Sequence, residues 1–296
     1  MTLQWTRPLL RNLTRRHFHT TKGRYLFYET YDKDGYSKKP QEQLEWEKLS
    51  WIDKIKFELS LQKEYVKEFV TDYKLEFNEG PRIIMPEHHV DVFWRFTGKK
   101  DEMKHWLVSC DSDHKEGHST AKLEYTRDNK GLFHGFIDTK VPHDGYLKRT
   151  GWANIRMAPK KTFITRSEAH DFDPYTHIVF RVRGDGRVYA VNLHYKNIYD
   201  VCMYDTFHYF IWTRGGPYWQ YVKIPFSRFV FAYKGRVQVT HKPVPKELIS
   251  SVSFTLADNI TGPFKLEIDY IGVQYDPNHE EESAYETYSF DNHLFW

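Results

Sequence analysis

Residues Phe180–His194 read FRVRGDGRVYAVNLH, with two alternating segments on either side of a pair of glycines. Apolar side chains occupy every second position in 178–183 and again in 188–193. A period of two residues is typical of β-strands that place one face on a core. Gly184, Asp185 and Gly186 lie where the chain must reverse, and glycine tolerates the positive φ that tight turns require. The stretch therefore predicts a β-hairpin whose turn is formed by these three residues.

Two other interpretations of the same residues predict a different protein. A phosphate-binding loop needs glycines that lead into the N-terminus of a helix, and here they lead into a second strand, so the pattern excludes that loop. Arg183-Gly184-Asp185 is also the tripeptide of adhesion loops. That interpretation requires an extracellular setting, and it therefore depends on where the protein resides.

The same period of two continues outward from the hairpin. About ten short strands are expected between residues 81 and 275, separated by clusters of Gly, Pro, Asn and Asp. This number of strands in about 190 residues predicts a single all-β domain, a sandwich or a barrel. The expected strands are 91–97, 105–110, 119–126, 131–138, 151–157, 178–183, 188–193, 207–213, 218–225, 250–257 and 264–273.

The N-terminal 28 residues have a distinct composition. They contain six basic residues and no acidic one, and Trp5, Leu9 and Leu13 recur at helical spacing. A basic amphipathic segment without a long apolar run is typical of a mitochondrial transit peptide. We expect cleavage between about Phe18 and Tyr28. The alternative is a basic arm that binds nucleic acid or membrane.

Removing this leader reverses the sign of the net charge. The whole chain is +3, but six of its 43 basic residues and none of its 40 acidic residues lie in 1–28, so the remainder carries three more acidic than basic residues. That balance argues against a nucleic-acid-binding protein. Two cysteines are too few for a disulfide framework or a cysteine zinc site. No apolar run approaches the ~20 residues of a transmembrane helix, so we expect a soluble or peripheral protein.

Two segments flank the strand-rich region. Residues 29–80 comprise a polar linker and, within 45–74, apolar residues at intervals of three and four with Lys and Glu between them. This pattern predicts a long amphipathic helix, and we expect it to dock on its own domain rather than to remain free for a partner. Residues 276–296 are acidic and then aromatic, and they are expected to form a tail.

Aromatic residues are concentrated between Tyr204 and Tyr233, where twelve of thirty positions are Phe, Tyr or Trp. Such residues can fill a sandwich core or line a binding face, and core is the simpler expectation. Within this region the segment TRGGPYWQ places Arg214, Tyr218 and Trp219 around a Gly-Gly-Pro turn. An exposed Arg and Trp would suit an interaction site, whereas a Trp folded inward would belong to the core. The three residues are our candidates for a protein interface.

No set of residues predicts catalysis or a bound metal. The loop CDSDHKEGH, 110–118, is rich in Asp and His but lacks the glycine and glutamate positions of an EF-hand. G-x-S-x-G does not occur. A pair among Asp185, Asp205, Glu267 and Asp269 would suit a glycosidase only at a defined separation, which a sequence cannot give. We therefore assign no catalytic, cofactor or metal residues.

Taken together, the longer blocks of the chain resemble the complex I intermediate-associated protein family, mitochondrial assembly factors for NADH:ubiquinone oxidoreductase. The resemblance spans about residues 82–275. The blocks are DVFWRFTGKKDEMKHWLVSCDSDHKEGHSTAKLEYT (91–126), GLFHGFIDT (131–139), GWANIR (151–156), the stretch 180–194, DTFHYFIWTRGGPYWQYVKIPFSRF (205–229) and GPFKLEIDYIGV (262–273).

This resemblance implies a galactose-binding-like jelly-roll β-sandwich, a matrix location, and association with a membrane-arm assembly intermediate of complex I and with other assembly factors. It implies no catalytic residues and no cofactor. In a reducing matrix the Arg-Gly-Asp tripeptide would not meet an adhesion receptor. The leading hypothesis is a non-enzymatic assembly chaperone, peripheral on the inner membrane if membrane-associated at all. The alternatives are a carbohydrate- or small-ligand-binding module and a hydrolase that uses surface carboxylates.

Overall fold

The computed structural model describes residues 49–56, isolated positions from 59 to 87, and most of 89–283. Within 89–283 the gaps are 115, 142–148, 159–160, 163–165, 168–169, 196–204, 234–235, 240–241 and 282. The leader, most of the polar linker and the end of the C-terminal tail lie outside the described residues. In the part of the chain that is described, no helix is long and apolar enough to cross a bilayer.

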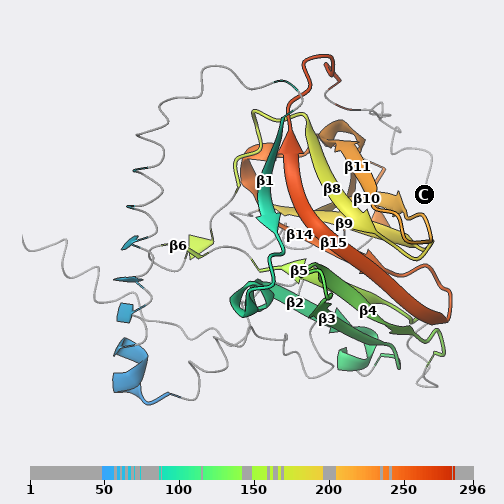
Figure 1. Cartoon of the computed structure of the whole chain (residues 1–296), viewed down its shortest axis with the longest axis horizontal. Helices are drawn as coiled ribbons and strands as arrows, with labels where there is room; N and C mark the ends of the chain where they lie inside the picture. The colour runs from blue at the N-terminus through green and yellow to red at the C-terminus, as the bar shows by residue number, and fades with distance from the viewer. Residues whose placement is uncertain are drawn as a thin grey trace, which may run out of the picture.

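The strand-rich region forms two antiparallel sheets that pack face to face (Figure 1). The first sheet has six strands. Five of them follow the order β11-β8-β15-β4-β3, and the sixth, β1, pairs with the C-terminal half of β15. In Figure 1, β15 runs diagonally across the front of the molecule. The strands of this sheet are β1 (Val90–Arg95), β3 (Thr120–Tyr125), β4 (Gly131–Ile137), β8 (His177–Arg183), β11 (Gln220–Pro225) and β15 (Gly262–Gln274).

The second sheet has seven strands in the order β13-β12-β10-β9-β14-β5-β2. A separate short pair is formed by β6 (Lys161–Thr162) and β7 (Arg166–Ser167). The strands of the larger sheet are β2 (Trp106–Cys110), β5 (Ala153–Met157), β9 (Val188–Tyr195), β10 (Asp205–Trp212), β12 (Val230–Tyr233), β13 (Arg236–Val237) and β14 (Ile249–Leu256). Four 3-10 turns are described, η1 (Lys100–His105), η2 (Asp111–His114), η4 (Phe226–Arg228) and η5 (Lys246–Leu248).

The core lies between the two sheets and follows the predicted alternation. Phe180 of β8 and Phe254 of β14 come from opposite sheets, are fully buried, and meet edge to face with ring centroids 5.4 Å apart. Complete burial of such a side chain stabilises the fold by about 1.5–3 kcal/mol. The prediction of an all-β sandwich is confirmed.

The predicted hairpin at 180–194 is wrong in one respect. The chain does reverse at 184–187, but β8 pairs with β11 and β15, whereas β9 pairs with β10 and β14. The two strands therefore belong to different sheets and form an arch over the core rather than a hydrogen-bonded hairpin. Both arrangements place alternate side chains in the core, so periodicity does not distinguish them.

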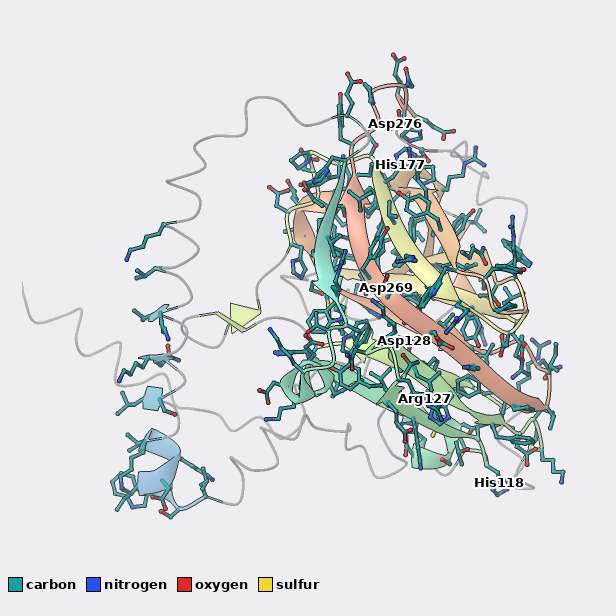
Figure 2. All side chains as sticks on the ribbon, viewed as in Figure 1. His118, Arg127, Asp128, His177, Asp269 and Asp276 are labelled. Atoms are coloured by element: carbon teal, nitrogen blue, oxygen red, sulfur yellow. The ribbon has the colours of Figure 1, made fainter. Side chains whose placement is uncertain are left out.

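Of the eight connections that cross between the two sheets in the described part of the chain, the strand registers place five at one end of the sandwich. Cys110 opposes Ala153, and Ala153 opposes Leu256 in the larger sheet, while Gly262 opposes Ile137 in the smaller one. Figure 2 shows His118 at this end and His177 with Asp276 at the other. We call the end near His118 the arch end. It contains the connections β2–β3, β4–β5, β8–β9, β10–β11 and β14–β15.

The amphipathic segment is helical at residues 51–56 and at further described positions up to residue 74. The expectation that its apolar side chains dock on the domain is wrong for those that the structure describes, because Trp51, Ile55, Leu59 and Val66 are all exposed. Helical periodicity identifies an apolar face, but it does not say what that face contacts.

Candidate functional site

Three of the crossing connections lie together at the arch end and include every residue proposed from the sequence as a site or turn. They are 184–187, 213–219 and 257–261, and we call them the arch corner. A cavity of about 400 Å³ opens between the first two connections and β15, lined by Arg183, Gly184, Asp185, Gly216, Pro217, Lys265 and Glu267. The sequence predicted the first two connections separately, but it gave no indication that they meet.

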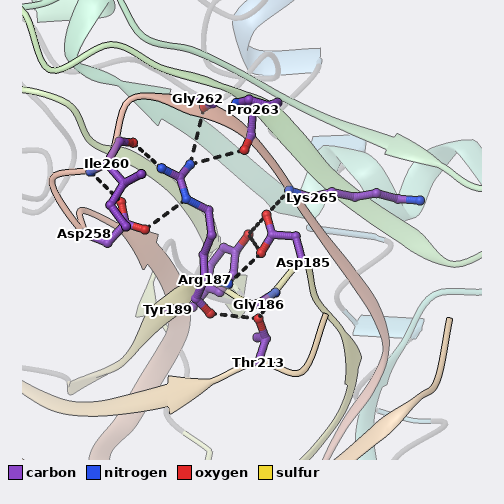
Figure 3. Close-up of polar contacts among 10 residues, drawn as sticks. All are labelled: Asp185, Gly186, Arg187, Tyr189, Thr213, Asp258, Ile260, Gly262, Pro263 and Lys265. Atoms are coloured by element: carbon purple, nitrogen blue, oxygen red, sulfur yellow. Dashed lines mark hydrogen bonds and ion pairs between the residues drawn. The ribbon is translucent and has the colours of Figure 1, made fainter. Parts of the chain in front are cut away.

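Arg187 fixes the third connection to the first (Figure 3). Its Nε donates to Asp258 Oδ2 at 2.9 Å, and its remaining nitrogens donate to the carbonyl oxygens of Ile260, Gly262 and Pro263. A guanidinium presents five donors in a rigid planar fork, so one side chain can satisfy a carboxylate and several carbonyls at once. Arg187 therefore holds the turn before β15 in a single geometry.

Thr213 and Asp185 hold the other contacts of the corner (Figure 3). The Thr213 hydroxyl accepts from the Gly186 amide at 3.0 Å and donates to the Arg187 carbonyl at 2.8 Å. The Asp185 carboxylate accepts from the Lys265 amide at 2.7 Å and from the Tyr189 hydroxyl. Burial and the nearby Asp185 charge raise the pKa of Tyr189 well above its ordinary value. The phenol thus remains a hydrogen-bond donor at physiological pH.

The two glycines of the arch are needed for different reasons. Gly186 has φ +97°, as expected from the sequence, but Gly184 is not in the positive-φ region. A Cβ at Gly184 would instead overlap the Thr213 side chain. The expectation of positive φ at both glycines is therefore wrong for Gly184, where close packing of one arch on another excludes a side chain.

Gly184→Val is expected to lower the free energy of unfolding by about 2–4 kcal/mol, because the new side chain must displace Thr213 and its hydrogen bonds. Gly186→Ala is expected to cost about 1 kcal/mol, because only the backbone conformation is disfavoured. Chemical denaturation of both variants measures the difference. Equal losses, or an unchanged midpoint for Gly184→Val, would contradict the packing argument.

The three candidate interface residues are displayed differently. Tyr218 is 81% exposed, and Arg214 is also exposed, with its amide held by the Gln220 side chain at 3.0 Å. Trp219 is half-buried, yet it does not enter the core. Its ring lies against the guanidinium groups of Arg181 and Arg183 on the outer face of the smaller sheet. The Cζ atoms of these arginines are 5.2 and 4.9 Å from the centre of the ring. All three side chains therefore lie on the outside of one corner.

The sequence missed the charged residues beneath Trp219. Arg183 Nε donates to Glu267 Oε2 at 3.1 Å, and Arg181 donates to Asp269 Oδ2 at 2.6 Å. Although both carboxylates lie on the outer face of the sheet, they are only 2% exposed. The alternation of Arg181 and Arg183 with core residues was the available signal, since it places both on the outer face.

These ion pairs do not favour carboxylate catalysis. Burial raises the pKa of Glu267, but hydrogen bonds from Arg183 and Lys265 outweigh that effect and leave the pKa below its ordinary value. A glycosidase acid needs the opposite shift. Asp185 and Asp205 are likewise engaged by tyrosine hydroxyls, from Tyr189 and Tyr195.

The acidic loop 110–118 contains a structural carboxylate. Asp111 is fully buried and accepts from the Ser119 amide and hydroxyl, the Thr150 hydroxyl and the Gly151 amide at 2.8–2.9 Å. It therefore joins the β2–β3 and β4–β5 connections. Among the described residues no group of three or more His, Cys, Asp or Glu side chains is placed to hold a metal ion. The Cys110 side chain is buried, and its Sγ lies 3.4 Å from Asp113 Oδ2.

The family model and the related sequences identify the same family. Residues 94–268 match the model of the family described as complex I intermediate-associated protein 30. The relative of that name from Drosophila melanogaster is 38% identical over 93% of this chain and 92% of its own length. The Mus musculus relative is 41% identical over 66% of this chain and 59% of its own length.

Among solved structures, a family 11 carbohydrate-binding module from Clostridium thermocellum aligns over 66% of this chain and 100% of its own, at 17% identity with a TM-score of 0.44. The family model covers more than half of the chain, and the Drosophila relative covers nearly all of it. The chain therefore belongs to the complex I intermediate-associated protein 30 family.

Proposed function

We propose that this protein is a mitochondrial assembly factor for respiratory complex I that acts by binding protein rather than by catalysis. The relatives carry names that describe association with a complex I intermediate. The partner that we propose is a membrane-arm assembly intermediate, together with other assembly factors. The acid-free basic leader supports delivery to the matrix, where the protein would act either free or peripherally on the inner membrane.

The observation that carries a binding role is the construction of the arch corner. Large side chains of the types that dominate protein interfaces, Arg214, Tyr218 and Trp219, project from a backbone held by Thr213 and Gln220. A rigid surface loses little conformational entropy when a partner binds. The corner thus has the composition and the rigidity of an interface.

The test is rescue of complex I assembly in cells depleted of the protein. The double variant Arg214→Ala/Tyr218→Ala is expected to fold with an unchanged melting temperature, because both side chains are exposed. We expect it to recover less of the assembly intermediate on affinity purification and to restore less complex I on native gels. A loss of at least about tenfold in affinity is typical of removing two interface anchors.

The matched control is Arg236→Ala/Tyr233→Ala, which removes the same residue types from the exposed edge at β12 and β13 of the other sheet. It is expected to rescue fully. If the arch-corner variant folds and also rescues fully, the corner is not the binding surface.

A further inference from the structure

The outer face of the smaller sheet beside the arch corner carries an unusual arrangement of charge. Glu267 and Asp269 lie next to one another on this face of β15, almost completely covered, and each is shared by two cations. Glu267 is paired with Arg183 and with Lys265 Nζ at 2.8 Å, and Asp269 with Arg181 and Lys130. Figure 2 shows Asp269 midway along β15. We call the four cations and the two carboxylates below them the cationic face.

The pairing leaves an excess of positive charge on the outside. Four cations face two carboxylates, and the Asp185 carboxylate lines the adjoining cavity with Arg183 and Lys265, so that one positive charge remains in excess. The carboxylates form the floor, and the cation heads form the accessible layer, with Lys265 59% and Arg181 44% exposed. A ligand approaching this surface therefore meets cations first.

The two arginines are held in place before any ligand arrives. Each is fixed on one side by a carboxylate and on another by the Trp219 ring. Arg183 Nη1 also donates to the Pro217 carbonyl at 3.2 Å, which ties the face to the arch corner. Fixing a long side chain in advance removes an entropic cost of roughly 0.5–1.5 kcal/mol per residue from binding.

The backbone spacing of the two arginines matches that of an extended ligand. Arg181 and Arg183 are two residues apart on β8, which separates them by about 6.6–6.8 Å along the strand. Alternate side chains of any extended polypeptide have the same separation. Exposed aromatic rings border the arginines, with Tyr221 opposite Arg181 in the register and Tyr218 in the adjacent turn. These rings add contact area along such a segment.

We propose that the cationic face binds an extended polypeptide segment with acidic side chains at alternate positions, and that this is how the arch corner recognises its partner. The inference rests on the proposed function, because it assigns a chemistry to the partner of the same surface. Charge and spacing both support it. A compact anion such as phosphate matches the charge but does not use the repeat along β8.

The test uses the purified full chain and a labelled peptide of alternating Glu and Thr, with a Gln-Thr peptide of the same length as comparison. We expect fluorescence anisotropy to show that the Glu-Thr peptide binds and the Gln-Thr peptide does not. The affinity for the Glu-Thr peptide should fall as salt is added. Arg181→Gln or Lys265→Gln is expected to weaken binding at least about fivefold. Lys122→Gln, an exposed change on β3 of the same sheet, is expected to leave it unchanged.

If Arg181→Gln unfolds the protein, Lys265→Gln still tests the inference. Lys265 is the more exposed of the two cations, and Glu267 keeps its ion pair with Arg183 when Lys265 is replaced. Absence of Glu-Thr binding, or equal weakening by Lys122→Gln, would overturn the inference. Binding of anionic phospholipid vesicles that requires Arg181 and Lys265, without peptide binding, would replace a polypeptide with a lipid surface and also overturn it.

Failure of this inference and failure of the proposed function give different results. If the Arg214/Tyr218 variant loses rescue but the acidic peptide does not bind, the interface stands and its partner is not acidic. If the peptide binds as expected while that variant and Lys265→Gln both rescue fully, the face binds acidic segments but complex I assembly does not depend on it.

Discussion

Replacement of Arg187 by alanine is expected to lower the free energy of unfolding by about 3–5 kcal/mol, the usual cost of breaking a buried ion pair from one side. The side chains of Arg187 and Asp258 are only 10% and 9% exposed. Without the guanidinium, Asp258 Oδ2 and the carbonyls of Ile260, Gly262 and Pro263 lose their donor together. Denaturant unfolding monitored by tryptophan fluorescence gives the change.

Arg187→Lys separates charge from geometry. Lysine restores a positive charge beside Asp258, but it lacks the planar fork that also reaches three carbonyls, so we expect it to recover only part of the loss. Arg214→Ala, an exposed change in the neighbouring connection, is the control and should remain within about 0.5 kcal/mol of the unmodified protein. A loss below about 1 kcal/mol for Arg187→Ala would show that the turn before β15 is held by other contacts.

Replacement of Asp111 by alanine is expected to be at least as damaging, again by about 3–5 kcal/mol. The Ser119 and Gly151 amides would be left without this acceptor in a site closed to solvent, and the Ser119 and Thr150 hydroxyls would keep only the Asp138 and Glu116 carbonyls. An unsatisfied buried donor costs about 1–3 kcal/mol before the site relaxes. Thermal and chemical unfolding of the purified protein measure the loss.

Asp111→Asn tests the requirement for acceptors. Asparagine has the same shape, but its amide nitrogen is a donor and must face other donors in either orientation, so the variant should remain clearly destabilised. Asp101→Asn, an exposed change in η1, should have little effect. If Asp111→Asn unfolds like the unmodified protein, the network is not stabilising.

The strands could be predicted from the sequence because each carries its own signal. Every segment proposed from alternation is a strand in the structure, and the ends of each strand lie within two residues of the proposed ends, from β1 at Val90–Arg95 to β15 at Gly262–Gln274. The missed strands are short. β12 has four residues, and β6, β7 and β13 have two each, too few to display a period.

The arrangement of the strands could not be predicted in the same way. Phe180 and Tyr189 alternate into the core whether β8 and β9 pair with each other or face each other across it. The choice depends on partners that are distant in sequence, such as Glu267 opposite Arg183. For that reason the sequence pointed to Gly184 and Trp219 individually, while Arg187 and Asp258, which hold the corner together, carried no local pattern.

The late position of β15 also has a consequence for how the protein is made. β1 pairs with its sheet only through β15. The strands β4 and β8 are also joined into one sheet by β15, which lies between them and pairs with both. More than 160 residues separate the end of β1 at Arg95 from the start of β15 at Gly262. A chain that is synthesised or translocated from its N-terminus therefore presents β1 as an unpaired edge while those residues emerge. Unpaired edges and distant pairings slow folding and invite misassociation. Completion of the sandwich therefore waits for the last strand, and β1 has no partner in its sheet until that strand arrives.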